Sequence, residues 1–338
     1  MKKNNEKIRG LLYGVALGDA FGMPTEMLSR QVINEMDLDF SRPFESLDIS
    51  IISKNRPAYS ITDDTMNTLM IMEMLKENNG VIDTNIYLEK LKNWTYNSPI
   101  AGYVTGPSTS RALREIKNGK SIEESGMFGT TNGAAMKISP IGLVSNYQNK
   151  DELIENVVNI CKPTHNTSIA LSGASVIAAV VSYFYCGGDS FDKMYEIAYE
   201  ISEKSKNRGF QWPSASLKHR INLAREIVDF VAVSVSGKNG VFWGAGVSEQ
   251  SILTLLYNEV GCSMETIDTV PVALALVYLS KGDALKCAQL AAEIGGDTDT
   301  IGSIATSICG VYRPETIPQE MIEEIEKVNN INFDNYIY

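Results

Sequence analysis

Apolar residues recur along most of the chain at the three- to four-residue spacing of an α-helix. From Ile301 to Ile308 they fall at positions i, i+3, i+4 and i+7, the pattern of a helix with one face in a core. The stretch 166–185 is apolar on most sides and rich in alanine, serine and glycine, which predicts a central, closely packed helix. Further helical stretches are predicted at 150–161, 190–204, 217–234, 249–259, 271–279, 282–293 and 315–328.

Alternation of apolar and polar residues at period two, which would indicate half-buried strands, is nearly missing. The best short strand candidate is VFWGAGV, residues 241–247, and its pattern is weak. Proline and glycine lie mostly between the helical stretches, and no repeat or low-complexity linker interrupts them. We therefore predict an all-α fold in which residues 1–338 form a single domain of many medium-length helices.

The composition agrees with a large helical domain and mainly excludes certain classes of partner. The 338 residues are 44% hydrophobic, which is enough for a large core. The formal net charge is −11 and no basic tract is present, so we expect no nucleic-acid partner. No C-x-x-C pair occurs, and several cysteines lie in apolar helical stretches, as in a cytoplasmic protein with reduced thiols. The cysteines are Cys161, Cys186, Cys262, Cys287 and Cys309.

Two apolar stretches invite a membrane interpretation that their details do not support. The N-terminal MKKNNEKIRGLLYGVALGDAFG is basic and then apolar, but its apolar run is short and contains Gly14, Gly18 and Asp19. We expect a helix that ends in a functional loop rather than a signal peptide. The run TVPVALALVYLS is well short of the roughly 20 residues of a membrane span. A membrane partner is therefore not expected.

Two acidic clusters, far apart in the sequence, each stand directly before a predicted helix. The first lies in SITDDTMNTLM and the second in GGDTDTIGSIATSICG. Either cluster alone could be a helix cap, because Asp and Thr cap helix N-termini and acids favour the positive end of the helix dipole. Members of one cluster would diverge on a regular helix, so they can converge only in the loop or cap before it. The oxygen-bearing residues are Thr62, Asp63 and Asp64, and Asp297, Asp299 and Thr300.

Four carboxylates in one place would repel one another, and a divalent cation would relieve that repulsion. The candidate ligands are all oxygens, and the chain has only two histidines, His165 and His219, which excludes a histidine-rich zinc site. Oxygen ligands favour Mg²⁺, Mn²⁺ or Ca²⁺. If both clusters contribute, they could hold two ions about 3.5–4 Å apart.

Five segments together resemble the ADP-ribosylglycohydrolases, which include the dinitrogenase-reductase-activating glycohydrolase and the ADP-ribosyl-acceptor hydrolases. They occur in the family's order and are spread over nearly the whole chain. The resemblance implies an all-α domain around a cleft with two Mg²⁺ or Mn²⁺ ions, held by the six residues of the two clusters. It also implies hydrolysis of the glycosidic bond at the distal ribose of ADP-ribose. The segments are GLLYGVALGDAFGMPTE, TDDT, TTNGAAMKISPIGL, PTHNTSIALSGA and GGDTDTIGSIATSICG.

The resemblance also implies roles for single residues. Glu26, which matches the family's glutamate beside the metals, and Asp299 are the candidate catalytic residues. Glu26 could instead be an ordinary surface carboxylate, and Asp19 could either hold a ligand residue or end the first helix. His219 is expected to be solvated or at the protein boundary. The candidate substrate-binding residues are Asn132, Gly133, His165 and Gly296.

Two of these substrate-binding predictions have plain structural alternatives. Backbone N–H groups before a helix in TTNGAAM would suit a diphosphate, but the Asn-Gly pair could be a simple turn. His165 could merely cap or pack against the helix that begins near Asn166.

The identity of the acceptor stays open. GYVTG, residues 102–106, matches the family's glycine-rich segment only in part, and residues 205–247 match nothing. We expect metal-dependent hydrolysis of an ADP-ribosyl linkage on a modified protein or a small molecule. The alternatives are an N-glycosidase of nucleoside-like substrates and a non-catalytic relative that binds ADP-ribose; the six intact ligand positions argue against the latter. The sequence does not indicate the oligomeric state.

Overall fold

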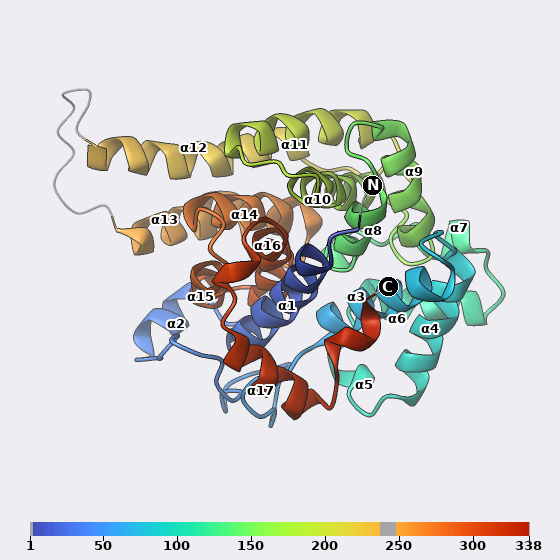
Figure 1. The fold of residues 1–338 in the computed structure, drawn as a ribbon, viewed down its shortest axis with the longest axis horizontal. Coiled ribbons are helices and arrows are strands. Elements are labelled where there is room, and N and C mark those ends of the chain that lie inside the picture. Colours follow the sequence, from blue (N-terminus) through green and yellow to red (C-terminus); the bar gives the residue numbers. More distant parts are fainter. Residues whose placement is uncertain (1–2, 237–247, 338) are drawn as a thin grey trace.

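The computed structural model describes residues 3–236 and 248–337, and helices connected by loops make up this part of the chain (Figure 1). Within these residues β-pairing is limited to three isolated bridges, one of them between Leu28 and Gly296. The all-α prediction is therefore confirmed. The strand candidate at 241–247 lies outside the described residues.

The helices differ in length from single turns to five turns. The α-helices are α1 (Asn5–Gly22), α2 (Arg30–Glu35), α3 (Asp63–Glu77), α4 (Thr84–Asn97), α5 (Ala101–Val104), α6 (Pro107–Lys117), α7 (Ile122–Ser125), α8 (Ser139–Val144), α9 (Lys150–Cys161), α10 (Ser168–Tyr185), α11 (Phe191–Ser205), α12 (Leu217–Ser236), α13 (Glu249–Leu255), α14 (Thr266–Leu279), α15 (Ala284–Ile294), α16 (Thr298–Tyr312) and α17 (Gln319–Asn329). Short 3₁₀ turns are η1 (Met23–Thr25), η2 (Asn132–Ala134), η4 (Pro314–Thr316) and η5 (Phe333–Tyr336), and η3 (Leu256–Val260) is a π-helical turn.

Prolines explain the largest differences from the predicted helix ends. α14 begins at Thr266 and contains Pro271 inside the helix, whereas the sequence predicts a start at 271. The hydroxyl of Thr266 donates to the carbonyls of Thr130 and Thr131, so tertiary contacts extend the helix beyond its proline. Further along the chain, Pro318 is the N-cap of α17, so this helix starts after the proline rather than at residue 315.

α10 is the central helix that the sequence predicts. Every residue from Ser168 to Tyr185 is buried, and α8, α9, α11, α14 and α16 pack around it. By length and composition alone, α10 is apolar enough to cross a membrane. Its complete burial among other helices accounts for that apolarity, because a helix that is hydrophobic all round can be the centre of a large core.

α1 and α16 lie near the middle of the molecule (Figure 1) and pack antiparallel, with their backbones in contact. A Cβ atom added to Gly14 would lie 2.1 Å from the carbonyl oxygen of Thr306, and one added to Gly18 would lie 2.3 Å from the backbone of Gly302. Only glycine permits this approach. The contact brings the end of α1 beside the start of α16, which is where the turn with Glu26 and the second acidic cluster lie.

Candidate active site

The first acidic cluster opens α3, and Asp19 from α1 holds it in place. The carboxylate of Asp19 accepts hydrogen bonds from the backbone N–H of Thr62 at 2.9 Å and of Thr65 at 3.1 Å, and from the Thr65 hydroxyl at 2.5 Å. Thr62 is the N-cap of α3. Asp19 lies inside α1, which ends at Gly22. Of the two roles considered for Asp19, the structure therefore supports holding a candidate ligand and not ending the helix.

The second cluster opens α16, and a glycine pair leads into it. Gly295 and Gly296 have φ angles of 86° and 83°, which favour glycine. The Gly296 N–H donates to the Leu28 carbonyl at 2.8 Å, and its carbonyl accepts from the Met27 N–H at 2.7 Å. This bridge ties the turn after Glu26 to the start of α16. Because the bridge uses both polar backbone atoms of Gly296, its role here is structural, and substrate binding by Gly296 stays a prediction.

The two clusters meet, although more than 230 residues separate them in sequence. Asp64 accepts from the hydroxyls of Ser303 at 2.6 Å and Thr300 at 3.2 Å. Carboxylate oxygens of Glu26, Asp297 and Asp299 lie within 4.8 Å of one another. The residues of the clusters that line one common pocket are Asp63, Asp64, Asp297, Asp299 and Thr300. Thr62 lies behind it as the cap of α3, with its hydroxyl 3.3 Å from Asp64.

Burial and crowding make this pocket a poor place for isolated negative charge. Burial raises the pKa of Asp63, Asp64 and Asp299 well above the usual range of an aspartate, and neighbouring carboxylates raise it further. Burial, and then the charge of Asp297, raise the pKa of Glu26 to about 8. Oδ1 of Asp299 is buried without a hydrogen-bond partner. Surplus carboxylates and a buried oxygen that lacks a donor are the features that a divalent cation would satisfy.

The Asn132–Gly133 pair forms one wall of the pocket. The Asn132 amide donates to Asp297 at 2.5 Å and to the Thr269 hydroxyl at 2.8 Å, so this turn is tied to the second cluster. The segment is the 3₁₀ turn η2, and α8 begins only at Ser139. The expected helix N-terminus is therefore not at this position, and a diphosphate would have to rely on individual groups instead.

His165 lies beside this turn, where the ring packs against Gly133. A Cβ atom on Gly133 would come within 2.8 Å of the ring. Nε2 is 3.0 Å from the Thr131 hydroxyl, and Nδ1 is 2.8 Å from the Thr164 hydroxyl. The helix that follows is capped by Thr167, so the alternative that His165 caps it is wrong. His219 is exposed, as expected.

Comparison with known proteins agrees with this geometry. The family model described as ADP-ribosylglycohydrolase matches residues 1–335. The chain belongs to the ADP-ribosylglycohydrolase family. The resemblance found in the five sequence segments is thereby confirmed, and membership of this glycohydrolase family supports a hydrolase.

Two relatives and one solved structure show how far the family similarity extends. The chain is 34% identical to an uncharacterized protein, YegU, of Escherichia coli K12, over 98% of this chain and 95% of that one. It is 28% identical to the ADP-ribosylhydrolase ARH3 of Xenopus tropicalis, over 91% and 87% of the two chains. A structure titled ADP-ribosylglycohydrolase-related protein complex shares the fold, with a TM-score of 0.61 over 97% of both chains at 20% identity.

In this member of the ADP-ribosylglycohydrolase family, sequence reasoning missed an aromatic cluster near the pocket. The rings of Phe128, Phe210 and Trp212 lie 6.2–6.4 Å apart, centroid to centroid. The Arg111 guanidinium lies 5.7 Å from the centre of the Phe128 ring. Phe128 is 50% exposed and is three residues before Thr131, which lines the pocket. Its position just before TTNG was the only available signal.

A second missed residue is Ser53, in the long loop between α2 and α3. Its hydroxyl donates to Oε2 of Glu26 at 2.8 Å, and Ser53 is fully buried. Glu26 itself is half-buried in the turn after η1, so it is not an ordinary surface carboxylate. Nothing in the sequence pattern connects Ser53 with Glu26.

Proposed function

We propose that the protein hydrolyses the glycosidic bond between the distal ribose of ADP-ribose and an acceptor, with the aid of two Mg²⁺ or Mn²⁺ ions. The observation that carries this proposal is the meeting of the two clusters, in which Ser303 and Thr300 of α16 donate to Asp64 of α3. Family membership and the similarity to ARH3, an ADP-ribosylhydrolase, support the substrate class.

The residues fit a divalent metal centre by their chemistry. They offer oxygen donors only, they carry more negative charge than their neighbours balance, and Asp299 has a buried oxygen without a donor. When bound, the ions would hold sugar oxygens and stabilise negative charge that develops during the reaction. The proposed ligands are Thr62, Asp63, Asp64, Asp297, Asp299 and Thr300.

Glu26 is the proposed group that moves a proton. Glycoside cleavage needs help at the leaving group or at the attacking water, and Glu26 lies beside Asp297 and Asp299 without being part of either cluster. The Ser53 hydroxyl fixes one of its oxygens, and the bridge at Gly296 fixes its turn. We also assign Asp299 a catalytic role, because a carboxylate oxygen of Asp299 lies within 4.8 Å of one of Glu26.

The wall formed by Asn132, Gly133 and His165 is the proposed contact surface for the rest of ADP-ribose. It begins at Asp297, to which Asn132 donates, and leads through Thr131 towards Phe128 and Arg111. An aromatic face can stack on a nucleobase, and a guanidinium binds phosphate. A ligand with its ribose at the carboxylates and its base near Phe128 would use both ends of this surface.

Calorimetric titration with ADP-ribose, AMP and ribose tests the substrate class. With Mg²⁺ present, ADP-ribose should bind far more tightly than AMP or ribose, and chelation should abolish this difference. Equal affinity for ribose and ADP-ribose would support the nucleoside N-glycosidase alternative and refute the proposal. A substrate panel of ADP-ribosyl-arginine and ADP-ribosyl-serine peptides, with free nucleosides as controls, then identifies the acceptor.

The Glu26→Gln variant separates catalysis from binding. It should keep its affinity for ADP-ribose and lose about 10²–10⁴-fold in turnover, the usual contribution of general acid–base catalysis. A matched control is Glu35→Gln, because Glu35 lies at the end of α2 outside the pocket. Turnover by the Glu26 variant within a few-fold of the control would assign Glu26 a structural role. A wild-type protein that binds ADP-ribose and releases no product would be a non-catalytic relative.

A further inference from the structure

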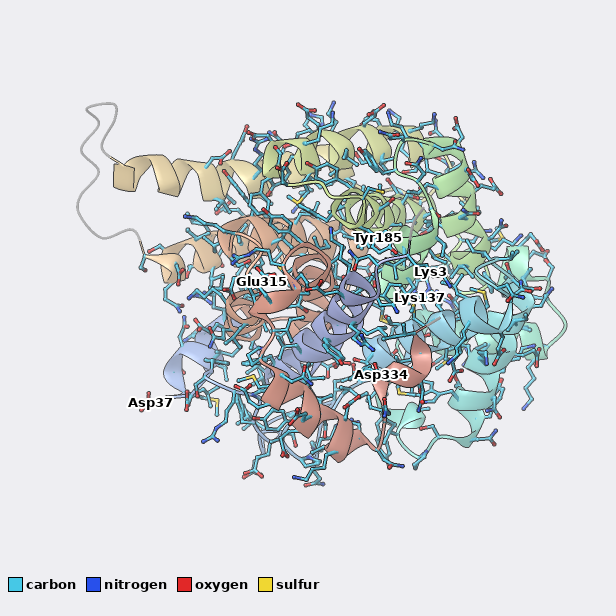
Figure 2. All side chains as sticks on the ribbon, viewed as in Figure 1. Lys3, Asp37, Lys137, Tyr185, Glu315 and Asp334 are labelled. Carbon is cyan, nitrogen blue, oxygen red and sulfur yellow. The ribbon has the colours of Figure 1, made fainter. Side chains whose placement is uncertain are left out.

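Lys137 is a buried lysine that the proposed reaction does not use. It is 1% exposed, and its label lies well inside the outline of the molecule in Figure 2. Its Nζ donates to the Thr164 hydroxyl at 3.0 Å and lies 5.0 Å from the centre of the Tyr87 ring. Within residues 3–236 and 248–337, no ion pair joins it to a carboxylate. Burial of an ammonium group without a directly paired carboxylate is costly, and the more distant negative charge of Asp63 offsets the effect of burial on the lysine pKa only in part.

The hydrogen bonds on both sides of His165 have a defined direction. An ammonium group has no lone pair, so the Thr164 hydroxyl accepts from Lys137 and its own proton points elsewhere. Among the described residues, the acceptor found for that proton is Nδ1 of His165, at 2.8 Å. On the other side, the Thr131 hydroxyl donates to Ser108 at 2.9 Å. Thr131 must therefore accept from Nε2 of His165, at 3.0 Å. Both ends of the chain of hydrogen bonds select the same ring tautomer, with the proton on Nε2.

We propose that Lys137 and Thr164 are positioning residues that hold His165 as the neutral Nε2–H tautomer, packed on Gly133 in the wall of the pocket. The importance of this tautomer for ADP-ribose rests on the proposed function, but the tautomer itself does not.

The electrostatic surroundings oppose a second proton on the ring. Burial, and then the positive charges of Lys137 and Arg111, lower the pKa of His165 well below its usual range. Burial also lowers the pKa of Lys137, while the face of the Tyr87 ring stabilises its ammonium form. The pocket wall thus presents a fixed, uncharged ring whose only N–H is already directed at Thr131.

Nitrogen NMR of the histidine rings tests the tautomer directly, since the chain has two histidines and His219→Gln assigns the second. At pH 7 the wild-type protein should show a protonated Nε2 and an unprotonated Nδ1 for His165. A proton on Nδ1, or on both nitrogens, would overturn the proposal. This measurement uses no ligand, so a protein with the expected tautomer that fails to bind ADP-ribose would refute the proposed function and leave this inference standing.

Lys137→Met shortens the side chain by one atom, keeps it unbranched and removes its charge. Without the ammonium group the Thr164 proton can turn away from the ring, so a second tautomer should appear beside the first. ADP-ribose affinity should fall several-fold, because the ring that packs on Gly133 is no longer held in one state. The free energy of unfolding should be unchanged or higher, because an apolar group replaces a buried charge. Wild-type ring signals in this variant would overturn the positioning role.

If Lys137→Met does not fold, the pair Thr164→Val and Thr164→Ser decides the question. Valine has the shape of threonine without its hydroxyl, whereas serine keeps the hydroxyl. Thr164→Val should lose the hydrogen bond at Nδ1 and the ADP-ribose affinity, and Thr164→Ser should keep both. Identical Nδ1 signals in the two variants would show that Thr164 does not position the ring.

Discussion

Replacing Asp299 by asparagine should stabilise the metal-free protein and remove most of the stabilisation that a divalent cation provides. Oδ1 of Asp299 is buried without a partner, and a buried acceptor left unsatisfied costs about 1–3 kcal/mol. Its carboxylate also lies within 4.8 Å of those of Glu26 and Asp297. Asparagine removes one negative charge, and its Nδ2 can donate to a neighbouring carboxylate. We therefore expect the free energy of unfolding to rise by about 1–3 kcal/mol in chelator.

Addition of the cation should reverse this order. A metal present at 100 times its dissociation constant stabilises the wild-type fold by about 2.7 kcal/mol, provided that the unfolded chain cannot gather the ligands. The variant lacks one proposed ligand, so it should gain much less. Urea unfolding at pH 8, in chelator and in Mg²⁺ or Mn²⁺, measures both differences.

The matched control is Asp283→Asn, at the N-cap of α15. Asp283 accepts from the N–H of Lys286 at 2.9 Å, outside the pocket, and Asp and Asn are about equally good caps. This control should follow the wild-type protein in both conditions. The reasoning fails if Asp299→Asn is less stable than the wild-type protein in chelator, or if both gain the same free energy from the metal.

Three further predictions concern the backbone and the pocket wall. Gly296→Ala should lower the free energy of unfolding in urea by more than about 2 kcal/mol, because the positive φ of this residue disfavours a side chain and the added Cβ would lie 2.0 Å from the Cys262 carbonyl oxygen. Calorimetry should also show weaker metal binding by this variant. An unchanged metal affinity would contradict a positioning role for the bridge between Gly296 and Leu28. Gly18→Ala should lower the free energy of unfolding by about 1–3 kcal/mol or more, because the added Cβ overpacks the contact with α16. If the variant unfolds at the wild-type urea concentration, the contact between α1 and α16 is looser than described. Since burial lowers the pKa of His165, the unfolded chain binds a proton that the folded one excludes, so the contribution of His165 to the free energy of unfolding should fall as the pH drops below about 6.5. The difference in free energy of unfolding between the wild-type protein and His165→Asn should therefore shrink below about pH 6.5, and a difference that does not change with pH would contradict this assignment.

The sequence predicts the helical part of the fold well because helix periodicity is local. It also predicts that both acidic clusters begin helices, since capping residues and the apolar run after them are neighbours in sequence. Asp63 and Asp297 fall where this logic places them, at the starts of α3 and α16. Metal binding by these two residues stays a prediction.

The contacts that position the site could not be predicted from the same patterns. Asp19 caps α3 across 43 residues, and Ser53 reaches Glu26 from a loop without helical periodicity. The sequence around Lys137 would fit an exposed lysine as well as a buried one, and only the packed structure shows that this lysine is buried. Such contacts depend on how separate segments meet, and no local spacing encodes that geometry.

The pairing of α1 with α16 has a consequence for how the protein is made. Asp297 and Asp299 are synthesised more than 270 residues after Glu26, roughly tens of seconds later at ordinary elongation rates. During this time the glycine face of α1 has no partner, and no cation can be captured by the complete ligand set. A chain that ends before Asp297 therefore lacks three of the six proposed metal ligands, so the candidate site is completed only when α16 has packed on α1.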